Sequence, residues 1–562
     1  MKNIFKYLSA NRILIIGMLT ILSISCKKDY NGNFELPRQF KPGDINITQG
    51  ETQVKLEWNA SLFTTGKDVQ YTVEVSKDGT FQGAIDYTQT IDTSVIVITD
   101  ADLEVRQPYY ARVKANALGN TEESGWVVSD VFMITGEQIF FPVLDIELKD
   151  TSVILRWRPT PGLTKITVTP SGGASFDIPL DATDIANNYK FIDVLAPLTN
   201  YTAEIFKGAV SKGTVDFTTK EPNIFTIILN PGDDLVTAVN NAVTGDIIGL
   251  NPGTYDCLDG TGTFTTLVIL QKTIGIQSVS GDPLDTRVNF KEINLKGNGA
   301  GVTLKGIDFD ASASTATGQT ALYFLNFTGL AADGDPAVFT DVLVENCRVH
   351  EMGNTFMRAN RGSSNGAHKI NSIKINNSFV YNLATVNTNY SFFQINKLAF
   401  ATLEVTNSTL YSIGRCFVDW DATFSVNPRP VITVDHCTIN NLGLANQTYI
   451  LFDVNANDVE VTMSNCIFGN TPYPGATVGP GDLIRAGNAI IGINNSNLFN
   501  IMDGAMPTSA PLTIPSNVTL NNITNIDLGW TGATTDFTLP QGSPLRTAST
   551  TGGPIGDPRW AF

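Results

Sequence analysis

A motif that recurs about every 30 residues constrains the fold of this chain more than any other feature. Each copy reads apolar, variable, Asn or His, Cys or Ser, variable, apolar. The third position is occupied in turn by Asn346, Asn377, Asn407, His436 and Asn465, at spacings of 31, 30, 29 and 29 residues. The surrounding residues are β-branched, alternate with a period of two and lie between Asn- and Gly-containing turns, which predicts short strands.

A coil of about 30 residues built from short strands is one turn of a parallel β-helix. Successive coils stack about 4.8 Å apart, so equivalent residues lie above one another. We expect the Asn column, including His436, to form a structural ladder that satisfies polar groups whose burial would otherwise cost about 1–3 kcal/mol each. The small residues of the next column are expected to be buried and free of disulfides: Cys347, Ser378, Ser408, Cys437 and Cys466.

The β-helix is predicted to span residues 223–562 in about ten coils. A short amphipathic helix over residues 234–243 is expected to cover the open edge of the first coil. Residues 267–278 and 302–311 are typical of further early coils, and residues 543–560 are expected to pack along the side.

The segment at 231–255, above all its turn DIIGLNPGTY, resembles the entry segment of the pectate-lyase-like β-helix family, which includes alginate and chondroitin lyases. This resemblance implies a right-handed parallel β-helix.

Two modules precede the β-helix, at residues 41–136 and 138–221. Both consist of short alternating runs broken by turns, which predicts all-β sandwiches. The order of Trp58 and later tyrosines in the first module, and Trp157 followed by a tyrosine-corner pattern at Tyr201 in the second, resembles fibronectin type III domains. Both tryptophans are expected in the cores, and the modules are expected to act as a spacer.

The N-terminus has the pattern of an export signal. Residues 1–25 combine three positive charges with an apolar run of 12 residues at 13–24, too short to span a bilayer. Cys26 follows, and the segment resembles a lipoprotein signal in which this cysteine is lipidated, although Ser23 stands where Leu is preferred. Residues 26–40 are expected to form a flexible tether. The alternative is an ordinary signal peptide with an incidental cysteine.

Composition excludes several classes of function. The formal charge is −17 and falls to about −20 without the signal, so nucleic acid is not an expected partner. The three histidines show no zinc-ligand spacing, and there is no P-loop, dinucleotide-binding or nucleophile-elbow motif. The whole layout resembles Bacteroidetes surface lipoproteins with fibronectin-like modules and a β-helix domain of unknown function. The resemblance implies a protein in the outer membrane that faces the cell exterior. It also implies a role in the use of pectin-type glycans, with an outer-membrane glycan importer as partner.

Polar residues also recur 12 to 20 positions after each Asn or His of the motif. Their period-two spacing places them on one outward face, where they would form a polar strip. Its members are Arg358, Asn360, Arg361, Gln394, Asn396, Lys397, Asp419, Asp421, Asp453, Asn455 and Arg485. Such a strip suits an acidic polysaccharide such as pectin, because arginine pairs with carboxylates and amides bond hydroxyls. The simpler interpretation is the solvated face of a solenoid.

Four functions remain open. The first is non-catalytic binding of an acidic polysaccharide. The second is a pectate-lyase-like polysaccharide lyase, with Arg358 or Arg361 as base, Lys397 or Lys374 as alternatives, and Asp419, Asp421 and Asp453 holding Ca²⁺. The third is a glycoside hydrolase using the same aspartates, and the fourth is a structural or adhesive surface protein. Whether the protein is an enzyme is left open.

Overall fold

The computed structural model describes residues 38–561 except 63, 65–68, 223, 361–363, 422, 444–449, 455–457, 473–482 and 506–507. The predicted export signal with Cys26, most of the tether, and the site residues Arg361 and Asn455 lie outside the described residues. Within them, no helix is long and apolar enough to cross a membrane.

The chain divides into two compact units, one of residues up to 140 with 157–188 and 202–215, the other of residues 141–156, 189–201 and 216 onward. The N-terminal part carries fibronectin type III-like sandwiches, as predicted. The first module has the antiparallel sheets β1 (Asn46–Gln49), β2 (Gln53–Glu57), β5 (Val95–Thr99), and β4 (Tyr87–Ile91), β3 (Tyr71–Ser76), β6 (Tyr110–Ala115), β7 (Val127–Val128). The second has β10 (Phe176–Pro179), β9 (Lys165–Pro170), β12 (Asn200–Lys207), β13 (Val210–Thr218) in one sheet and β11 (Tyr189–Ile192), β8 (Val153–Arg156) in another, with α2 (Ala182–Asn187) and the 3₁₀ turn η1 (Asp145–Glu147).

The predicted core aromatics of these modules are buried. Trp58 and Trp157 are almost fully buried. The hydroxyl of Tyr201 accepts a hydrogen bond from the backbone N–H of Ala196 at 2.8 Å, which is the tyrosine corner expected from the sequence. These residues therefore stabilise the modules and are not platforms for sugars.

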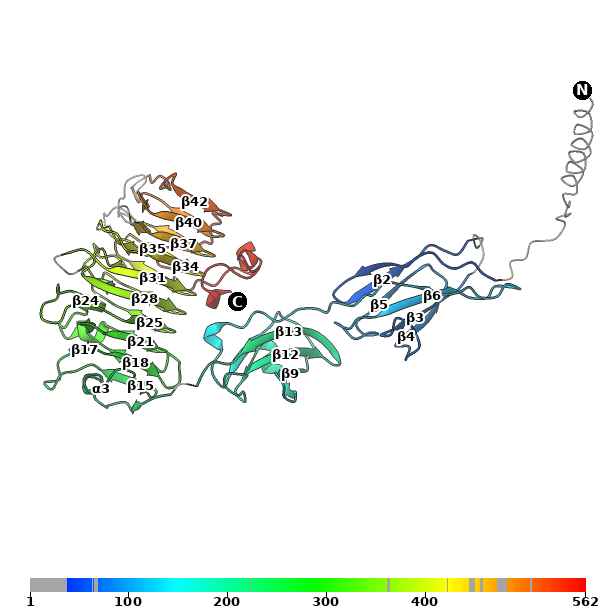
Figure 1. The fold of residues 1–562 in the computed structure, drawn as a ribbon, viewed down its shortest axis with the longest axis horizontal. Coiled ribbons are helices and arrows are strands. Elements are labelled where there is room, and N and C mark those ends of the chain that lie inside the picture. Colours follow the sequence, from blue (N-terminus) through cyan, green and yellow to red (C-terminus); the bar gives the residue numbers. More distant parts are fainter. Residues whose placement is uncertain are drawn as a thin grey trace, which may run out of the picture. The chain divides into compact units, whose positions relative to one another are not determined.

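The rest of the chain is a parallel β-solenoid of three sheets (Figure 1). The twelve-stranded sheet contains β14 (Ile227–Leu229), β15 (Ile247–Leu250), β18 (Thr273–Ser278), β21 (Gly301–Lys305), β25 (Asp341–Glu345), β28 (His368–Asn376), β31 (Ala399–Thr406), β34 (Val431–Asp435), β37 (Glu460–Ser464), β40 (Ile490–Asn494), β42 (Val518–Asn521), and β24 (Ala337–Val338) beside β28. The nine-stranded sheet contains β16 (Gly253–Asp256), β19 (Thr286–Asn289), β22 (Asp308–Asp310), β26 (Arg348–His350), β29 (Phe379–Tyr381), β32 (Thr409–Ile413), β35 (Thr438–Leu442), β38 (Ile467–Thr471) and β41 (Asn497–Ile501). The eight-stranded sheet contains β17 (Thr266–Leu270), β20 (Glu292–Lys296), β23 (Tyr323–Thr328), β27 (Thr355–Arg358), β30 (Phe393–Gln394), β33 (Val418–Asp419), β36 (Phe452–Asp453) and β39 (Ile484–Arg485).

In the described part of the chain, eight turns contribute a strand to all three sheets, compared with the predicted figure of about ten coils. The additional strands β14 and β40–β42 form incomplete coils at the two ends. Inward side chains from all three sheets join one continuous hydrophobic core. Because each coil packs mainly on its neighbours, the stability of the solenoid depends on these coil-to-coil contacts.

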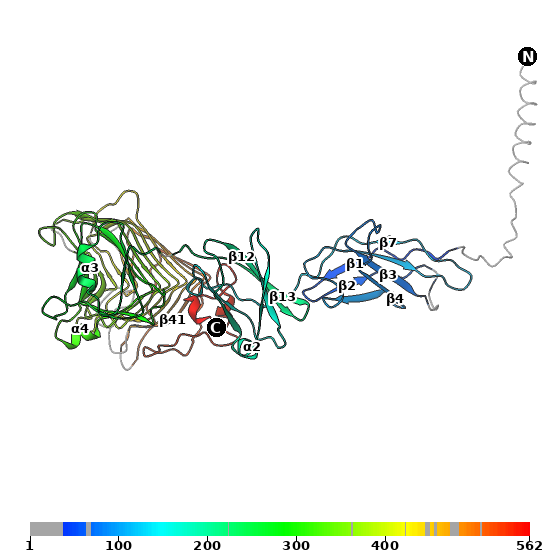
Figure 2. The same cartoon turned by 90° about the horizontal axis from the view of Figure 1, so that it is seen from below.

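Helix α3 (Leu235–Asn241) begins where the amphipathic pattern predicts and lies across the first coil (Figure 2). The side chain of Asp234 caps its N-terminus by accepting from the backbone N–H of Thr237. Leu235 and Val239 join the core. At the other end, the buried ammonium of Lys272 donates to the carbonyls of Val239, Asn240 and Ala242 at 2.6, 2.9 and 2.8 Å. The helix is thus bonded to the coil that it covers.

The Asn column is formed by backbone conformation as well as by side-chain bonds. Asn346, Asn377, Asn407, His436 and Asn465 all have φ between 49° and 53°. Asn tolerates this left-handed conformation better than most residues. The predicted side-chain ladder is only partly present, because Asn407 donates to Asn376 and Asn465 to Asp435, each one residue before the column. His436 occupies the same conformation and contacts Asp435 at 2.8 Å, as expected for a structural residue.

Replacing Asn407 with alanine is expected to lower the free energy of unfolding by about 1–2 kcal/mol. The left-handed backbone conformation is unfavourable for alanine, and one hydrogen bond is lost. Replacement with glycine loses the bond but adopts this φ freely, so its loss should be smaller. Urea denaturation of the two variants measures the difference, and equal losses would contradict the conformational explanation.

The column beside the Asn residues also has its predicted role. Cys347, Cys437 and Cys466 are buried and free. Their position is equivalent to that of Ser378, whose hydroxyl accepts from the backbone N–H of Cys347 at 3.2 Å. Small side chains at this position therefore allow hydrogen bonds between successive coils.

The C-terminal extension packs along the nine-stranded sheet, as predicted, with the 3₁₀ turns η2 (Pro544–Thr547) and η3 (Pro558–Trp560). The carboxylate of Asp557 accepts from the hydroxyl of Thr409 at 2.7 Å. The ring of Trp560 lies 6.0 Å from that of Phe379. The extension therefore covers the later coils of the nine-stranded sheet. The predicted polar strip lies on a different sheet, the eight-stranded one.

Candidate functional site

Parallel pairing aligns one polar residue from each of six consecutive strands of the eight-stranded sheet. The pairs are Asn326 with Arg358, Arg358 with Gln394, Gln394 with Asp419, Asp419 with Asp453, and Asp453 with Arg485. We call this row the polar ladder. The period-two pattern predicts this alignment, and the preceding residue of each strand from β27 onward points into the core.

The parallel row predicted two residues further on lies beside the polar ladder. The amide of Asn396 donates to Asp421 at 3.2 Å, and Arg358 Nε donates to Asn360 at 3.1 Å. Lys397 is half-buried and has an interaction partner. Lys374, an alternative base in the sequence analysis, lies instead on β28 in the twelve-stranded sheet, where it contacts Glu404 at 3.6 Å.

Apart from the half-buried Arg485, the polar ladder is buried, which corrects the expectation of a solvated strip. Arg358 and Gln394 are 9% and 8% exposed, while Asp419 and Asp453 are 1% and 0% exposed. The period of two gives the outward direction of a side chain on a strand, but not which other side chains pack against it. Buried charges must be paired or neutralised, so the contacts of these carboxylates determine what they can do.

Arg415, which the sequence analysis did not single out, provides the main counter-charge. Its guanidinium donates to Asp419 at 2.8 Å and to Asp453 at 2.7 Å. Arg485 donates to Asp453 at 2.7 Å and to Asp421 at 3.3 Å. Gln394 adds a bond to Asp419 at 2.5 Å. We call Arg415, Asp419, Asp421, Asp453 and Arg485 the charge network.

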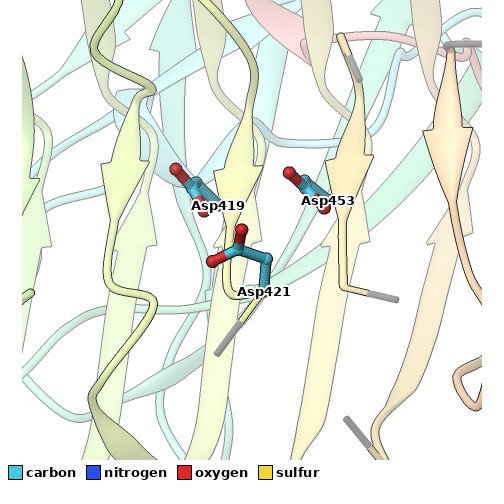
Figure 3. Close-up of side chains that lie close together, drawn as sticks. All are labelled: Asp419, Asp421 and Asp453. Carbon is cyan, nitrogen blue, oxygen red and sulfur yellow. The ribbon is translucent and has the colours of Figure 1, made fainter. Parts of the chain in front are cut away.

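The three aspartates of this network were predicted to hold Ca²⁺. They do lie together, with one oxygen of each within 4.8 Å of the others (Figure 3). However, the two guanidiniums bind these same carboxylates and neutralise two of the three negative charges. Calcium would have to displace arginines from their bonds, so the residues fit an arginine–aspartate network better than a metal centre.

Burial raises the pKa of Asp419 to about 6; Arg415 opposes the shift, while Asp421 and Asp453 add to it. Because the folded state binds this proton at higher pH than the unfolded chain, the carboxyl should stabilise the protein increasingly as pH falls from about 7 to about 4.

Asp419→Asn is therefore expected to remove a stability difference of at most about 3 kcal/mol between neutral and mildly acidic pH. Thermal unfolding of both proteins at several pH values measures it. An unchanged pH dependence in Asp419→Asn would show that Asp419 titrates normally.

Two tyrosines form the other end of the site. The Arg358 guanidinium lies 4.5 Å from the centre of the Tyr323 ring, a cation–π distance. Tyr323 and Tyr390 are half-buried, with ring centres 6.1 Å apart. Burial raises the pKa of Tyr323, and a side-chain hydrogen bond with Asn354 opposes this shift. This arrangement combines aromatic faces, a cation and amides.

Several buried oxygens of this face have no hydrogen-bond partner in the described part of the chain. They are one side-chain oxygen each of Asn326, Asn354, Asn396 and Asp419. An unsatisfied buried polar atom costs about 1–3 kcal/mol. All four atoms are acceptors with almost no exposed surface, so a ligand donor would reach them only after the covering side chains move.

A second charged cluster, missed by the sequence analysis, lies on the nine-stranded sheet. His350 contacts Asp308 at 3.0 Å, Arg287 binds Asp308 at 2.9 Å, and the rings of His350 and Tyr381 stack 4.7 Å apart. The same period-two alternation in residues 308–310 and 348–350 could have indicated it. Both nitrogens of His350 face carboxylates, so the cluster is internally paired.

Comparison with protein families matches residues 253–413 to a profile described only as a domain of unknown function (DUF4957). This match includes Arg358 and Gln394 but ends before the charge network. The search of curated proteins finds no match.

Among solved structures, the chain is similar to a two-domain fibronectin type III segment of chicken tenascin, at 16% identity and TM-score 0.18, covering 32% of this chain and 99% of that one. It is also similar to the FN1–FN3 domains of chicken CNTN1, at 15% identity and TM-score 0.16, covering 33% and 69%.

Proposed function

We propose that this protein binds an extracellular polysaccharide along the eight-stranded sheet of its β-solenoid. The observation that carries the proposal is the polar ladder, which places one polar side chain on each of six consecutive strands, with the half-buried rings of Tyr323 and Tyr390 beside one end. A polysaccharide presents many hydroxyl donors along a line, and the coils present acceptors along a line with a regular spacing.

The N-terminal sequence and the sandwich modules support a location at the cell surface. Cys26 would carry a lipid anchor in the outer membrane, facing the cell exterior, and the two sandwich modules would serve as a spacer. An outer-membrane glycan importer would be the natural recipient of the bound chain. Rigid strands suit this role, because they hold the binding groups in place before the ligand arrives.

Binding is favoured over lysis or hydrolysis by the state of the charged groups. Asp419 and Asp453 are bonded to Arg415, and Arg485 is bonded to Asp453 and Asp421. Groups committed to one another are poorly placed to transfer protons to a substrate.

A glycoside hydrolase is the second candidate, on one observation. The pKa of Asp419, raised to about 6 by burial, suits a general acid. A lyase using Arg358, and a purely adhesive protein, remain as further alternatives.

The test mixes the full-length chain with pectic, alginate and glycosaminoglycan polymers. Affinity electrophoresis measures binding, while ultraviolet absorbance of unsaturated uronates and reducing-end assays measure cleavage. We expect retarded migration in at least one polymer without new chain ends. New chain ends would establish an enzyme, and unretarded migration in every polymer would contradict the proposal.

The double variant Asn326→Ala/Asn396→Ala should weaken binding by roughly 30-fold, since two bonds of about 1 kcal/mol each are lost. Asn371→Ala provides the matched control, because this exposed asparagine lies on the twelve-stranded sheet. Equal effects of the two replacements would show that the eight-stranded face is not the binding surface.

A further inference from the structure

Among the described residues, Arg358 has no counter-ion, unlike Arg485 on the same eight-stranded sheet, which pairs with Asp421 and Asp453. In the described part of the chain, no carboxylate lies within ion-pair distance of its guanidinium, which contacts only the Asn360 side chain and the Tyr323 ring. Its side chain is nevertheless buried, with 9% of the residue exposed. Two ladder positions away, Asp419 already has Arg415 as its partner.

A buried cation without a partner is energetically unfavourable, because no opposite charge offsets the free-energy cost of its desolvation. The face of Tyr323 offsets this cost only in part, since cation–π contacts are worth about 0.5–2 kcal/mol. Beyond the bond from Nε to Asn360, the two terminal nitrogens of the guanidinium have no acceptor among the residues that the structure describes. These are the nitrogens that pair bidentately with a carboxylate.

The groups around Arg358 indicate what would carry this carboxylate. Tyr323 and Tyr390 offer half-buried rings against which an apolar sugar face can pack. The amides of Asn326, aligned with Arg358 on the neighbouring strand, and of Asn354, which contacts Tyr323, add polar groups next to these rings. A ligand with a ring, hydroxyls and a carboxylate in close proximity is a uronic acid.

We infer that Arg358, Tyr323 and Tyr390 form a specificity subsite for one uronic-acid residue of the bound polysaccharide. The inference rests on the proposed function and names its substrate class. The charge network excludes further carboxylates from the adjacent coils, because Asp419, Asp421 and Asp453 carry one more charge than the arginines that pair with them. The subsite thus sets the register of an acidic chain on the ladder.

The test compares polygalacturonate with the same polymer after chemical reduction of its carboxyl groups, in affinity gels at low ionic strength. The full-length chain should bind the acidic polymer at least tenfold more tightly. Arg358→Gln should weaken binding of the acidic polymer by roughly 10- to 100-fold, the value of a charge-assisted bond, and leave binding of the reduced polymer unchanged. Arg358→Lys should restore only part of the affinity, because lysine cannot pair bidentately.

Arg429→Gln is the matched control, because it removes the same charge from an exposed ion pair with Asp458, and it should leave both affinities unchanged. Dextran sulfate tests for a general anion site: binding as tight as that of polygalacturonate, and equally sensitive to Arg358→Gln, would overturn carboxylate specificity. Equal weakening of both galacturonate polymers by Arg358→Gln would make Arg358 a structural residue. If the unaltered chain binds neither polymer nor any other glycan, the proposed function fails; if it binds both equally, only the subsite is wrong.

Discussion

Replacing Arg415 with methionine is expected to lower the free energy of unfolding of the solenoid by about 3–5 kcal/mol at neutral pH. Methionine keeps much of the side-chain volume but leaves the buried carboxylates of Asp419 and Asp453 without their shared counter-charge. Guanidinium-induced unfolding followed by circular dichroism measures the loss. The loss should shrink at mildly acidic pH, because burial raises the pKa of both carboxyls and they accept protons readily once Arg415 is gone.

Arg429→Met is the control for this prediction. Its ion pair with Asp458 is exposed on both sides, and such pairs contribute about 0–1 kcal/mol. If Arg415→Met and Arg429→Met unfold at the same denaturant concentration, the charge network does not support the fold.

Replacing Phe392 with alanine is expected to cost about 3–5 kcal/mol, as for other large-to-small changes in well-packed cores. Phe392 is fully buried. Its ring stacks 4.7 Å from that of Phe356 and lies tilted at 5.5 Å from that of Phe417, both in neighbouring coils. The cavity would therefore interrupt a column of aromatic rings that joins successive coils.

Denaturant unfolding of Phe392→Ala measures this loss, with Phe191→Ala as control because that ring is 52% exposed. In a solenoid the coils nearest the cavity should unfold first, which proteolysis of the variant would reveal as cleavage near residue 392. A loss below about 1 kcal/mol would mean that the coil-to-coil core is loosely packed.

The fold follows from the repeat because stacking copies about 30 residues apart aligns equivalent residues. This alignment predicted that Arg358, Gln394, Asp419, Asp453 and Arg485 would form one row, and the strand pairing has that register. Periodicity reports the direction of a side chain on a strand but not what packs against it. Arg415 packs against Asp419 and Asp453 from outside the aligned positions, which is why the burial of the row was not predicted.

Arg415 and Tyr390 were missed for a related reason. Both lie in the segments just before a strand, outside the aligned positions, and reach the site only through three-dimensional folding. A second ladder was also overlooked, in which Asn500 donates to Asn470 and Asn470 to Asn440. Its 30-residue spacing could have been found by extending the search for repeats to a second column.

Hydroxyl-radical footprinting of the tyrosines tests the central claim most directly, because it reports where a polysaccharide lies on the full-length chain. Tyr323 and Tyr390 should be oxidised in the free protein and protected when an acidic polysaccharide is added. Tyr110 and Tyr189, half-buried in the sandwich modules, should be oxidised equally in both states. Protection of Tyr110 or Tyr189, or unchanged oxidation of Tyr323 and Tyr390 under conditions where the polymer is bound, would contradict glycan binding on the eight-stranded sheet.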